Sequence, residues 1–358
     1  MKAALPDSYR TWLRAILLVT LVTGCAEGVA KEDLPVWTFS GPTMGTRYNI
    51  SVVGGTQHDV ARLQKLVDGE LLKLNEQMST YDPKSELSRF NASTSDEWFG
   101  VSSQTASVVT AALELAEASG GKFDPTIGPL ANLWGFGPAG KRDEPPTDAE
   151  IAAAKESVDY QLLEVRLEPP ALRKQKPGVY VELSSIVPGY GADVIAELFE
   201  SEGFDNFVIE IGGEVRAQGL KPDGKPWRIG IERVDPKDDA SAPLTRVIEL
   251  RDIALATAGD YRSYFEWEGK RYSHTIDPQT GRPVTHNLAT VTVLADTGRD
   301  ADGLAKTLLV LGPEAGYDFA VKRGVAALMV SRSDEGKPIE RTTPAWDTKF
   351  GGDAAIAP

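Results

Sequence analysis

Histidine and cysteine are scarce in this 358-residue sequence, which has three histidines (His58, His274 and His286) and one cysteine, Cys25. A single cysteine excludes a disulfide framework within the chain, and three scattered histidines do not make an HExxH-type zinc site. If a histidine takes part in catalysis, it has to be one of these three.

Positive charge is also in deficit, since 38 Lys and Arg face 52 Asp and Glu and leave a net charge of −14. A nucleic-acid-binding surface carries a basic stripe, so we expect no nucleic-acid partner. An anionic ligand would need a metal ion or local Lys and Arg side chains to offset the repulsion.

Long hydrophobic runs are absent, and the N-terminal run AILLVTLV is too short to span a bilayer. It follows Arg10 and Arg14 and leads into LVTGC, which is typical of a bacterial lipoprotein signal with Cys25 as the lipidated residue. A signal peptide with an incidental cysteine is the alternative. We expect a protein anchored by lipid on the periplasmic side of a bacterial membrane, and Ala26 favours the outer membrane. Cleavage before Cys25 changes the net charge from −14 to −16 and leaves no other cysteine, which excludes thiol catalysis.

Nucleotide-binding glycine motifs are incomplete. In PGYGADVIAEL, Gly189 and Gly191 are followed by Val194 where a dinucleotide fingerprint has its third glycine, and no Walker A pattern occurs. The sequence therefore does not support a Rossmann or P-loop fold.

The hydrophobic pattern predicts a mixture of strands and helices. Alternation predicts strands at 46–54, 179–183, 289–295 and 325–330, and hairpins at 207–219 and 264–276. Helical spacing predicts helices at 60–78, 103–119, 192–203, 301–311 and 314–323, with 123–138 irregular and 184–193 a turn. We expect an α+β fold with largely antiparallel sheets. The expected divisions are a signal peptide (1–24), a linker (25–36), one catalytic unit (37–345), either undivided or in two lobes, and a flexible tail (346–358).

The stretch RYSHTIDPQTGRPV holds the best candidate for a catalytic base. Strand alternation places Tyr272, His274 and Ile276 on one face, and the turn DPQTGRP aims Asp277 and Arg282 at one end of the sheet. Histidine acts as a base near neutral pH, and a nearby carboxylate such as Asp277 can orient it. A packed histidine in a hairpin is the alternative.

Three acidic residues, Asp296, Asp300 and Asp302, cluster around the start of the predicted helix at 301–311. They suit either the capping of that helix or an oxygen-ligand site for a hard cation such as Mg²⁺.

Several stretches together resemble the FAD:protein FMN transferases of the ApbE type, formerly called thiamine-biosynthesis lipoproteins. They run in order from about 43 to 312: TMGTRYNI, STYDPKSELSRFN, FDPTIGPLANLWGFGP, VELSSIVPGYGADVIAELFESEG, VIEIGGEVRAQG, GDYRSYFEWEGKRYSHTIDPQTGRPV and ADGLAKTLLVLG. The resemblance implies a periplasmic enzyme that binds FAD and Mg²⁺. Such an enzyme joins FMN by a phosphodiester to a Thr or Ser of a membrane-bound redox protein and releases AMP.

The resemblance also implies site residues. It implies that His274 takes part in catalysis and that Ser185, Asp302 and Thr307 lie at the metal. The positions that it implies for the FAD site are Met44, Tyr81, Phe123, Asp124, Glu182, Pro188 and Ile276.

Three positions depart from the family pattern. Glu182 stands where Asp is usual, and Pro188 replaces a polar residue that contacts FAD. Lys306 stands where a metal-binding Thr is common, with Thr307 one position later. An ammonium there repels Mg²⁺ and can itself act as the counter-charge of a phosphate.

Three activities fit these features. The first is transfer of FMN to a subunit of a membrane redox complex, such as a sodium-translocating NADH:quinone reductase. The others are hydrolysis of FAD to FMN and AMP, and FAD binding without catalysis.

Overall fold

The computed structural model describes residues 34–142, 144–232, 244–260 and 263–350. The expected signal peptide, Cys25 and most of the expected linker lie outside these residues. None of the described helices has both the length and the apolar composition of a membrane span.

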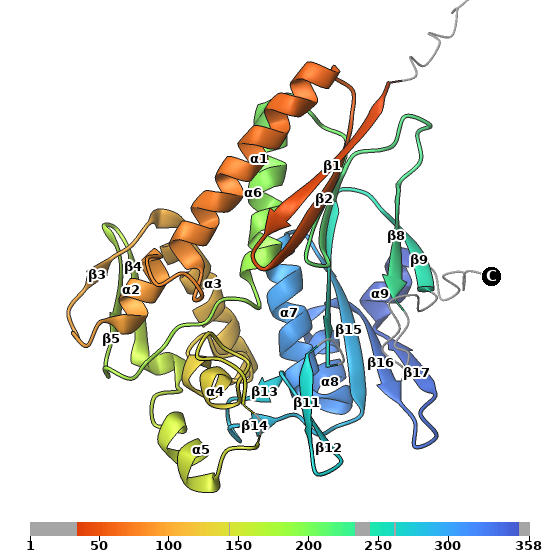
Figure 1. Cartoon of the computed structure of the whole chain (residues 1–358). Helices are drawn as coiled ribbons and strands as arrows, with labels where there is room; N and C mark the ends of the chain where they lie inside the picture. The colour runs from red at the N-terminus through yellow and green to blue at the C-terminus, as the bar shows by residue number, and fades with distance from the viewer. Residues whose placement is uncertain (1–33, 143, 233–243, 261–262, 351–358) are drawn as a thin grey trace, which may run out of the picture. The chain divides into compact units, whose positions relative to one another are not determined.

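An antiparallel sheet of eight strands forms the centre of the fold (Figure 1). Its order is β1-β2-β6-β7-β10-β15-β16-β17. The mixed α+β class expected from the sequence is therefore confirmed. The strands are β1 (Val36–Thr43), β2 (Thr46–Val53), β6 (Phe207–Ile211), β7 (Glu214–Gln218), β10 (Ile253–Gly259), β15 (Leu288–Ala295), β16 (Ala326–Arg332) and β17 (Pro338–Thr342).

The two faces of the sheet are covered differently, and strand β10 shows why. Its alternate residues Ile253 and Leu255 pack into one hydrophobic cluster, while Ala254 and Ala256 pack into another. Small alanine side chains let helices approach their face closely. The helices packed against that side of the sheet are α1 (Gln57–Met78), α6 (Val187–Ser201), α7 (Gly298–Leu311) and α8 (Pro313–Arg323).

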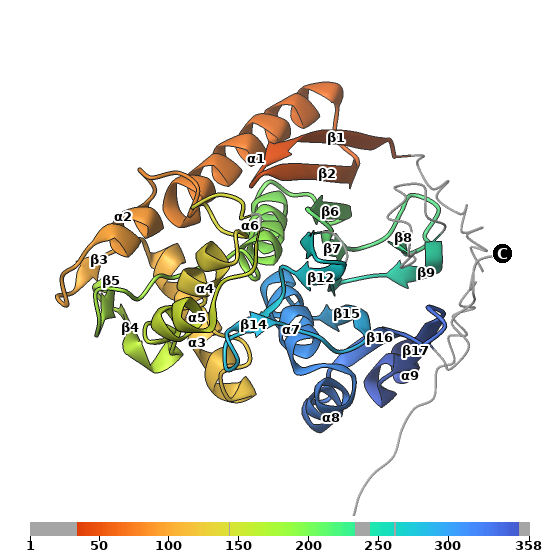
Figure 2. The ribbon, with the colours of Figure 1, turned by 60° about the horizontal axis from the view of Figure 1, so that its bottom comes forward.

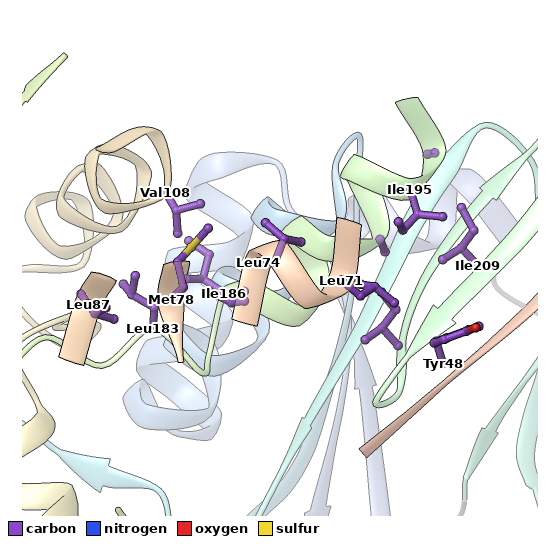
Figure 3. Close-up of a cluster of buried hydrophobic side chains, with 14 of the residues drawn as sticks. Tyr48, Leu71, Leu74, Met78, Leu87, Val108, Leu183, Ile186, Ile195 and Ile209 are labelled. Atoms are coloured by element: carbon purple, nitrogen blue, oxygen red, sulfur yellow. The ribbon is translucent and has the colours of Figure 1, made fainter. Parts of the chain in front are cut away.

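Helix α1 begins at Gln57 because Thr56 and Asp59 form a reciprocal capping box. Its buried stripe, including Leu71, Leu74 and Met78, enters the largest cluster of apolar side chains. Figure 3 shows these side chains in one cluster with Ile195 of α6 and Ile209 of β6. Full burial of each such side chain contributes about 1.5–3 kcal/mol to the free energy of unfolding.

The opposite face of the sheet is covered by the hairpin of β8 (Trp227–Glu232) and β9 (Leu244–Leu250) and by helix α9 (Pro344–Phe350). Trp346 of α9 is buried in this cluster. The folded part of the chain therefore continues past residue 345, where we expected a tail to begin, because an indole anchors the last described helix.

A second group of elements packs beside the sheet, and Figure 2 shows its α-helices to the left of α6 and α7. The aromatic hairpin β11–β12 and the short β13–β14 ribbon lie near its α4 helix (Figure 1). The helices of this group are α2 (Glu86–Ala92), α3 (Ser103–Ser119), α4 (Gly128–Leu133), α5 (Asp148–Lys155) and η1 (Tyr160–Leu162). The strands are β3 (Phe99–Gly100), β4 (Leu163–Leu167), β5 (Pro170–Lys174), β11 (Tyr264–Trp267), β12 (Lys270–Ser273), β13 (Ile276–Asp277) and β14 (Arg282–Pro283).

Three local predictions are wrong. Residues 179–183 alternate like a strand but make only an isolated bridge at Tyr180, because the amide of Val181 donates to the side chain of Asn91 and that of Glu182 to the carbonyl oxygen of a loop residue, Pro125. The expected turn at 184–193 is largely the first part of α6, since Pro188 lies in the first helical turn, where no amide donor is needed. The expected irregular stretch 123–138 contains α4, which begins at Gly128 and has Pro129 in its first turn in the same role.

Helices α6 and α7 cross at two glycines, and this crossing positions the candidate site. A Cβ atom on Gly189 would lie 2.1 Å from the carbonyl oxygen of Gly298, so only glycine permits the contact. Each helix gives the other a carboxylate: Asp193 of α6 accepts from the amide of Gly298, and Asp302 of α7 accepts from that of Gly189. A carboxylate at a helix N-terminus is favoured by the helix dipole.

Candidate active site

Two adjacent cavities lie beside the N-terminus of α6. The larger has a volume of about 620 Å³ and the smaller about 170 Å³, and they share Tyr81, Glu182 and Ser184 in their walls. The larger alone is within the roughly 300–1,000 Å³ typical of small-molecule sites. An elongated ligand can therefore run from one cavity into the other.

Most of the residues expected at the site line these cavities. They are Met44 and Pro188 in the larger cavity, Tyr81 and Glu182 in both, and Phe123, Asp124, Ser185, His274 and Ile276 in the smaller. Asp277, Asp302 and Thr307 line neither cavity, and Cys25 lies outside the described residues.

His274 follows strand β12 and is held in one orientation. Its Nδ1 lies 3.0 Å from the carbonyl oxygen of Ser263, which can only accept, so Nδ1 carries the proton and Nε2 keeps its lone pair. Burial, and after it the charge of Lys306, lower the pKa of His274 to about 3. The imidazole is therefore neutral at pH 7, as a general base has to be.

Asp277 does not orient His274, contrary to our expectation. Its Oδ2 accepts from Lys122 Nζ at 2.9 Å and its Oδ1 from the amide of Gln279 at 3.0 Å. Strand β12 ends at Ser273, and Asp277 belongs to the separate short strand β13, where it pairs with Arg282 of β14. The carboxylate instead holds the turn and a cavity-lining lysine.

A stack of aromatic rings fixes the hairpin that presents His274. Tyr272 lies 5.1 Å from Phe265 across the hairpin and 5.6 Å from Trp134, centroid to centroid. Trp134 also donates its indole N–H to the carbonyl oxygen of Gly281 at 2.8 Å. Such pairs contribute about 0.5–1.5 kcal/mol each beyond area burial, so the hairpin is rigidly joined to the loop after α4.

Glu182 ties the wall between the two cavities to a neighbouring loop. Its carboxylate accepts from the hydroxyl of Thr80 and from the amide of Ser184, both at 2.9 Å. The adjacent Tyr81 is 68% exposed, so its ring is available to a ligand. Burial of the hydroxyl and then the charge of Glu182 raise the pKa of Tyr81, which keeps the phenol neutral.

Asp124 and Met44 line the cavities and also have distinctive backbone features, which are hydrogen bonds to main-chain amides and a positive φ, respectively. Asp124 is buried and accepts from the amide and hydroxyl of Thr126 and from the amide of Tyr160, while burial raises its pKa to about 6. Met44, in the turn between β1 and β2, has a φ of 48°. Strained backbone of this kind often occurs at ligand sites.

The acidic cluster expected at the start of α7 does not form a cation site. Thr297 caps the helix, Asp300 pairs with Arg299, and the buried Asp302 points to the amide of Gly189. Nowhere in the described part of the chain do three His, Cys, Asp or Glu side chains gather as metal ligands.

The residues that the resemblance implied for Mg²⁺ do not fit that ion. Thr307 donates its hydroxyl to the carbonyl oxygen of Gly303 at 2.7 Å within its own helix. Lys306 follows Asp302 by one helical turn and lines the smaller cavity, whereas Thr307 does not. Burial lowers the pKa of Lys306 and raises that of Asp302, and the opposite charge of each partner opposes these shifts.

Some residues at the site were not anticipated. Lys122 and Phe136 lie within or beside stretches that carried the resemblance, but neither was singled out. Ser263 orients His274 through a backbone carbonyl, for which side-chain identity gives no signal. Thr80 was hidden in the turn STYDP, where only the fold reveals Glu182 as its partner.

The sequence model of the ApbE family matches residues 44–329 of this chain. Two curated relatives are each called FAD:protein FMN transferase. The Vibrio cholerae protein is 45% identical over 328 residues, which cover 91% of this chain and 95% of the relative. The Salmonella typhimurium protein is 38% identical over 332 residues, covering 91% and 94%.

Solved structures are similar over nearly the same extent. The flavin transferase ApbE from Vibrio cholerae superimposes with a TM-score of 0.81 at 42% identity, covering 88% of this chain and 99% of that one. The apo flavinyl transferase ApbE from Pseudomonas stutzeri gives a TM-score of 0.80 at 38% identity, covering 89% and 98%.

Proposed function

Since this chain belongs to the ApbE family and is a flavin transferase, we propose that it transfers FMN from FAD to a Thr or Ser hydroxyl of a membrane-bound redox protein. The new bond is a phosphodiester, and AMP is released. The observation that carries this proposal is His274, which has an unprotonated Nε2 and lines a cavity that continues into a second, larger one.

The residues of the site suit the two parts of this reaction. Tyr81 and Phe123 offer aromatic rings to the flavin, and His274 Nε2 takes the proton of the attacking hydroxyl. The hydroxyl oxygen attacks the phosphorus on the FMN side, the bond to the bridging oxygen breaks, and AMP leaves with that electron pair. Positioning and electrostatic stabilisation provide most of the acceleration in such transfers.

We further propose a lipid anchor at Cys25 and a place on the periplasmic side of a bacterial membrane, with the outer membrane preferred. The LVTGC pattern supports this. The anchor would keep the enzyme near acceptors such as a subunit of a sodium-translocating NADH:quinone reductase or a related electron-transfer complex.

A requirement for Mg²⁺ is not part of the proposal, because the donor set expected for that ion does not assemble around Lys306.

The test is to incubate the full-length protein with FAD and a candidate acceptor domain and to weigh the acceptor by mass spectrometry. We expect an increase in mass by one FMN, with equimolar AMP. A His274→Ala protein that binds FAD should lose the transfer by at least about a hundredfold, the lower end of general base catalysis. AMP formed without acceptor labelling would instead indicate hydrolysis.

A further inference from the structure

Lys306 places a cationic side chain in the smaller cavity of a protein with a net charge of −14. Its Nζ lies 3.4 Å from the neutral Nε2 of His274. Burial lowers the pKa of Lys306, and the negative charges of Asp302 and Glu214 oppose that shift and favour the ammonium. A cation facing a ligand cavity in a strongly acidic protein attracts an anionic ligand there.

The position of Lys306 is determined by the crossing of helices α6 and α7. Lys306 follows Asp302 by one turn of α7, so the two side chains share one face of the helix. Asp302 is fixed at the amide of Gly189, at the point where glycines bring α6 and α7 together. The ammonium is therefore delivered close to the start of α6.

The start of α6 lies where a ligand passes from one cavity to the other. Ser184 lines both cavities, Ser185 the smaller, and Val187 and Pro188 the larger. The amides in the first turn of α6 are already used, because Gly189 donates to Asp302, Val187 donates to the carbonyl oxygen of Leu183, and a proline follows Val187. An anion at this passage therefore needs a charged side chain as its partner. FAD carries its two negative phosphates in the middle of the molecule. A dinucleotide that occupies both cavities thus brings its diphosphate to this passage.

We propose that the ammonium of Lys306 is the resident counter-charge for the FAD diphosphate, so that this protein binds and cleaves FAD without a divalent cation. The proposal rests on the flavin transferase function proposed above. It identifies a residue of this chain, and not a metal ion, as the source of positive charge at the phosphates.

The proposed role of Lys306 also implies a sequence of hydrogen-bond changes at His274. In the free protein the ammonium donates toward His274 Nε2. When the diphosphate enters, the ammonium donates to phosphate oxygens instead, and Nε2 becomes free to accept the hydroxyl proton. Transfer then forms one P–O bond to the acceptor and breaks one P–O bond to AMP, with the proton on the imidazole.

The experiment measures FAD affinity of the full-length protein by flavin fluorescence, in EDTA and in Mg²⁺ at equal ionic strength. Lys306→Met removes the charge at similar length, and Lys306→Arg keeps it. Lys322→Met on α8, which lines neither cavity, is the matched control for net charge. Thermal unfolding verifies that each variant is folded.

We expect the wild-type Kd to agree within about twofold in the two buffers. Lys306→Met should weaken FAD binding by about 10- to 100-fold, as for the loss of a charged hydrogen bond. Lys306→Arg should retain most of the affinity, and Lys322→Met all of it. A wild-type protein that needs Mg²⁺ for binding overturns the proposal, as does wild-type affinity in Lys306→Met.

If Lys306→Met does not fold, the comparison of the wild-type Kd for FAD in EDTA and in Mg²⁺ tests the proposal by itself. Failure of the proposed function has a different signature. In that event FAD binds equally with and without Mg²⁺, but no acceptor is labelled and no AMP is formed.

Discussion

The Nζ of Lys306 lies 3.4 Å from the Nε2 of His274, while the carbonyl oxygen of Ser263 holds the opposite ring nitrogen at 3.0 Å. The base of the site therefore stands between a fixed acceptor and a cation. Burial disfavours the imidazolium and the ammonium adds repulsion, and together they outweigh the contact with the carbonyl oxygen, which by itself raises the pKa of His274.

The first prediction concerns the protonation of His274 in the free protein. Its pKa of about 3 lies below the ordinary 6.5, so the ring should stay neutral as the pH falls from 6.5 to 4. Lys306→Met removes the repulsion and should raise this pKa. NMR of the labelled ring, assigned with His274→Gln, measures both midpoints. A wild-type midpoint above 6, or a variant midpoint no higher than that of the wild type, would contradict the prediction.

Most regular elements could be predicted because their signals are local. The alternation of Tyr48, Ile50 and Val52 matches the buried face of β2, and α3 ends at Gly120, which adopts the left-handed conformation at its C-cap. The wrong predictions arose where tertiary contacts decide. Residues 179–183 have the pattern of a strand, but a strand also needs a partner, and the sequence does not show one.

The site was predictable to the extent that long motifs carried it. His274, Tyr81 and Glu182 do come together at two cavities. The hydrogen-bond partners of the site residues were harder to predict, because a carboxylate that is near in sequence need not be near in space. Asp277 binds Lys122, and a backbone carbonyl orients His274. Lys306 was recognised as a departure, but only the fold shows that its ammonium faces the base.

A second prediction concerns Asp124 and stability against pH. Burial raises its folded-state pKa from 3.8 to about 6, so the folded state binds more protons than the unfolded state between these values. Its contribution to the free energy of unfolding should therefore fall by about 2 kcal/mol as the pH rises from 4 to 6.

Denaturant unfolding of the wild type and of Asp124→Asn across this range measures the difference. The stability of the wild type relative to the variant should decline with rising pH and level off above about 6. A difference that is independent of pH would show that the buried carboxyl titrates alike in both states, against the prediction.

The third prediction tests the crossing that places Asp302 and Lys306. In Gly189→Ala the new methyl would meet backbone atoms of Gly298 at 2.1 Å and 2.5 Å, and backbone cannot rotate away as a side-chain tip can. We expect α6 and α7 to be forced apart, with a loss of about 1–3 kcal/mol or more in the free energy of unfolding. The N-terminus of α6 then shifts against the cavities, so FAD affinity should fall as well.

Gly69→Ala on the exposed side of α1 is the control, because a methyl group there meets no atom within 4 Å. That change should leave FAD binding intact and stabilise the protein by about 0.5–1 kcal/mol, since alanine loses less backbone freedom in a helix. Urea unfolding and FAD titration of both variants separate the two cases. Equal stability of Gly189→Ala and Gly69→Ala would mean that the two helices tolerate a wider separation, and the placement of Lys306 would then not depend on their close contact.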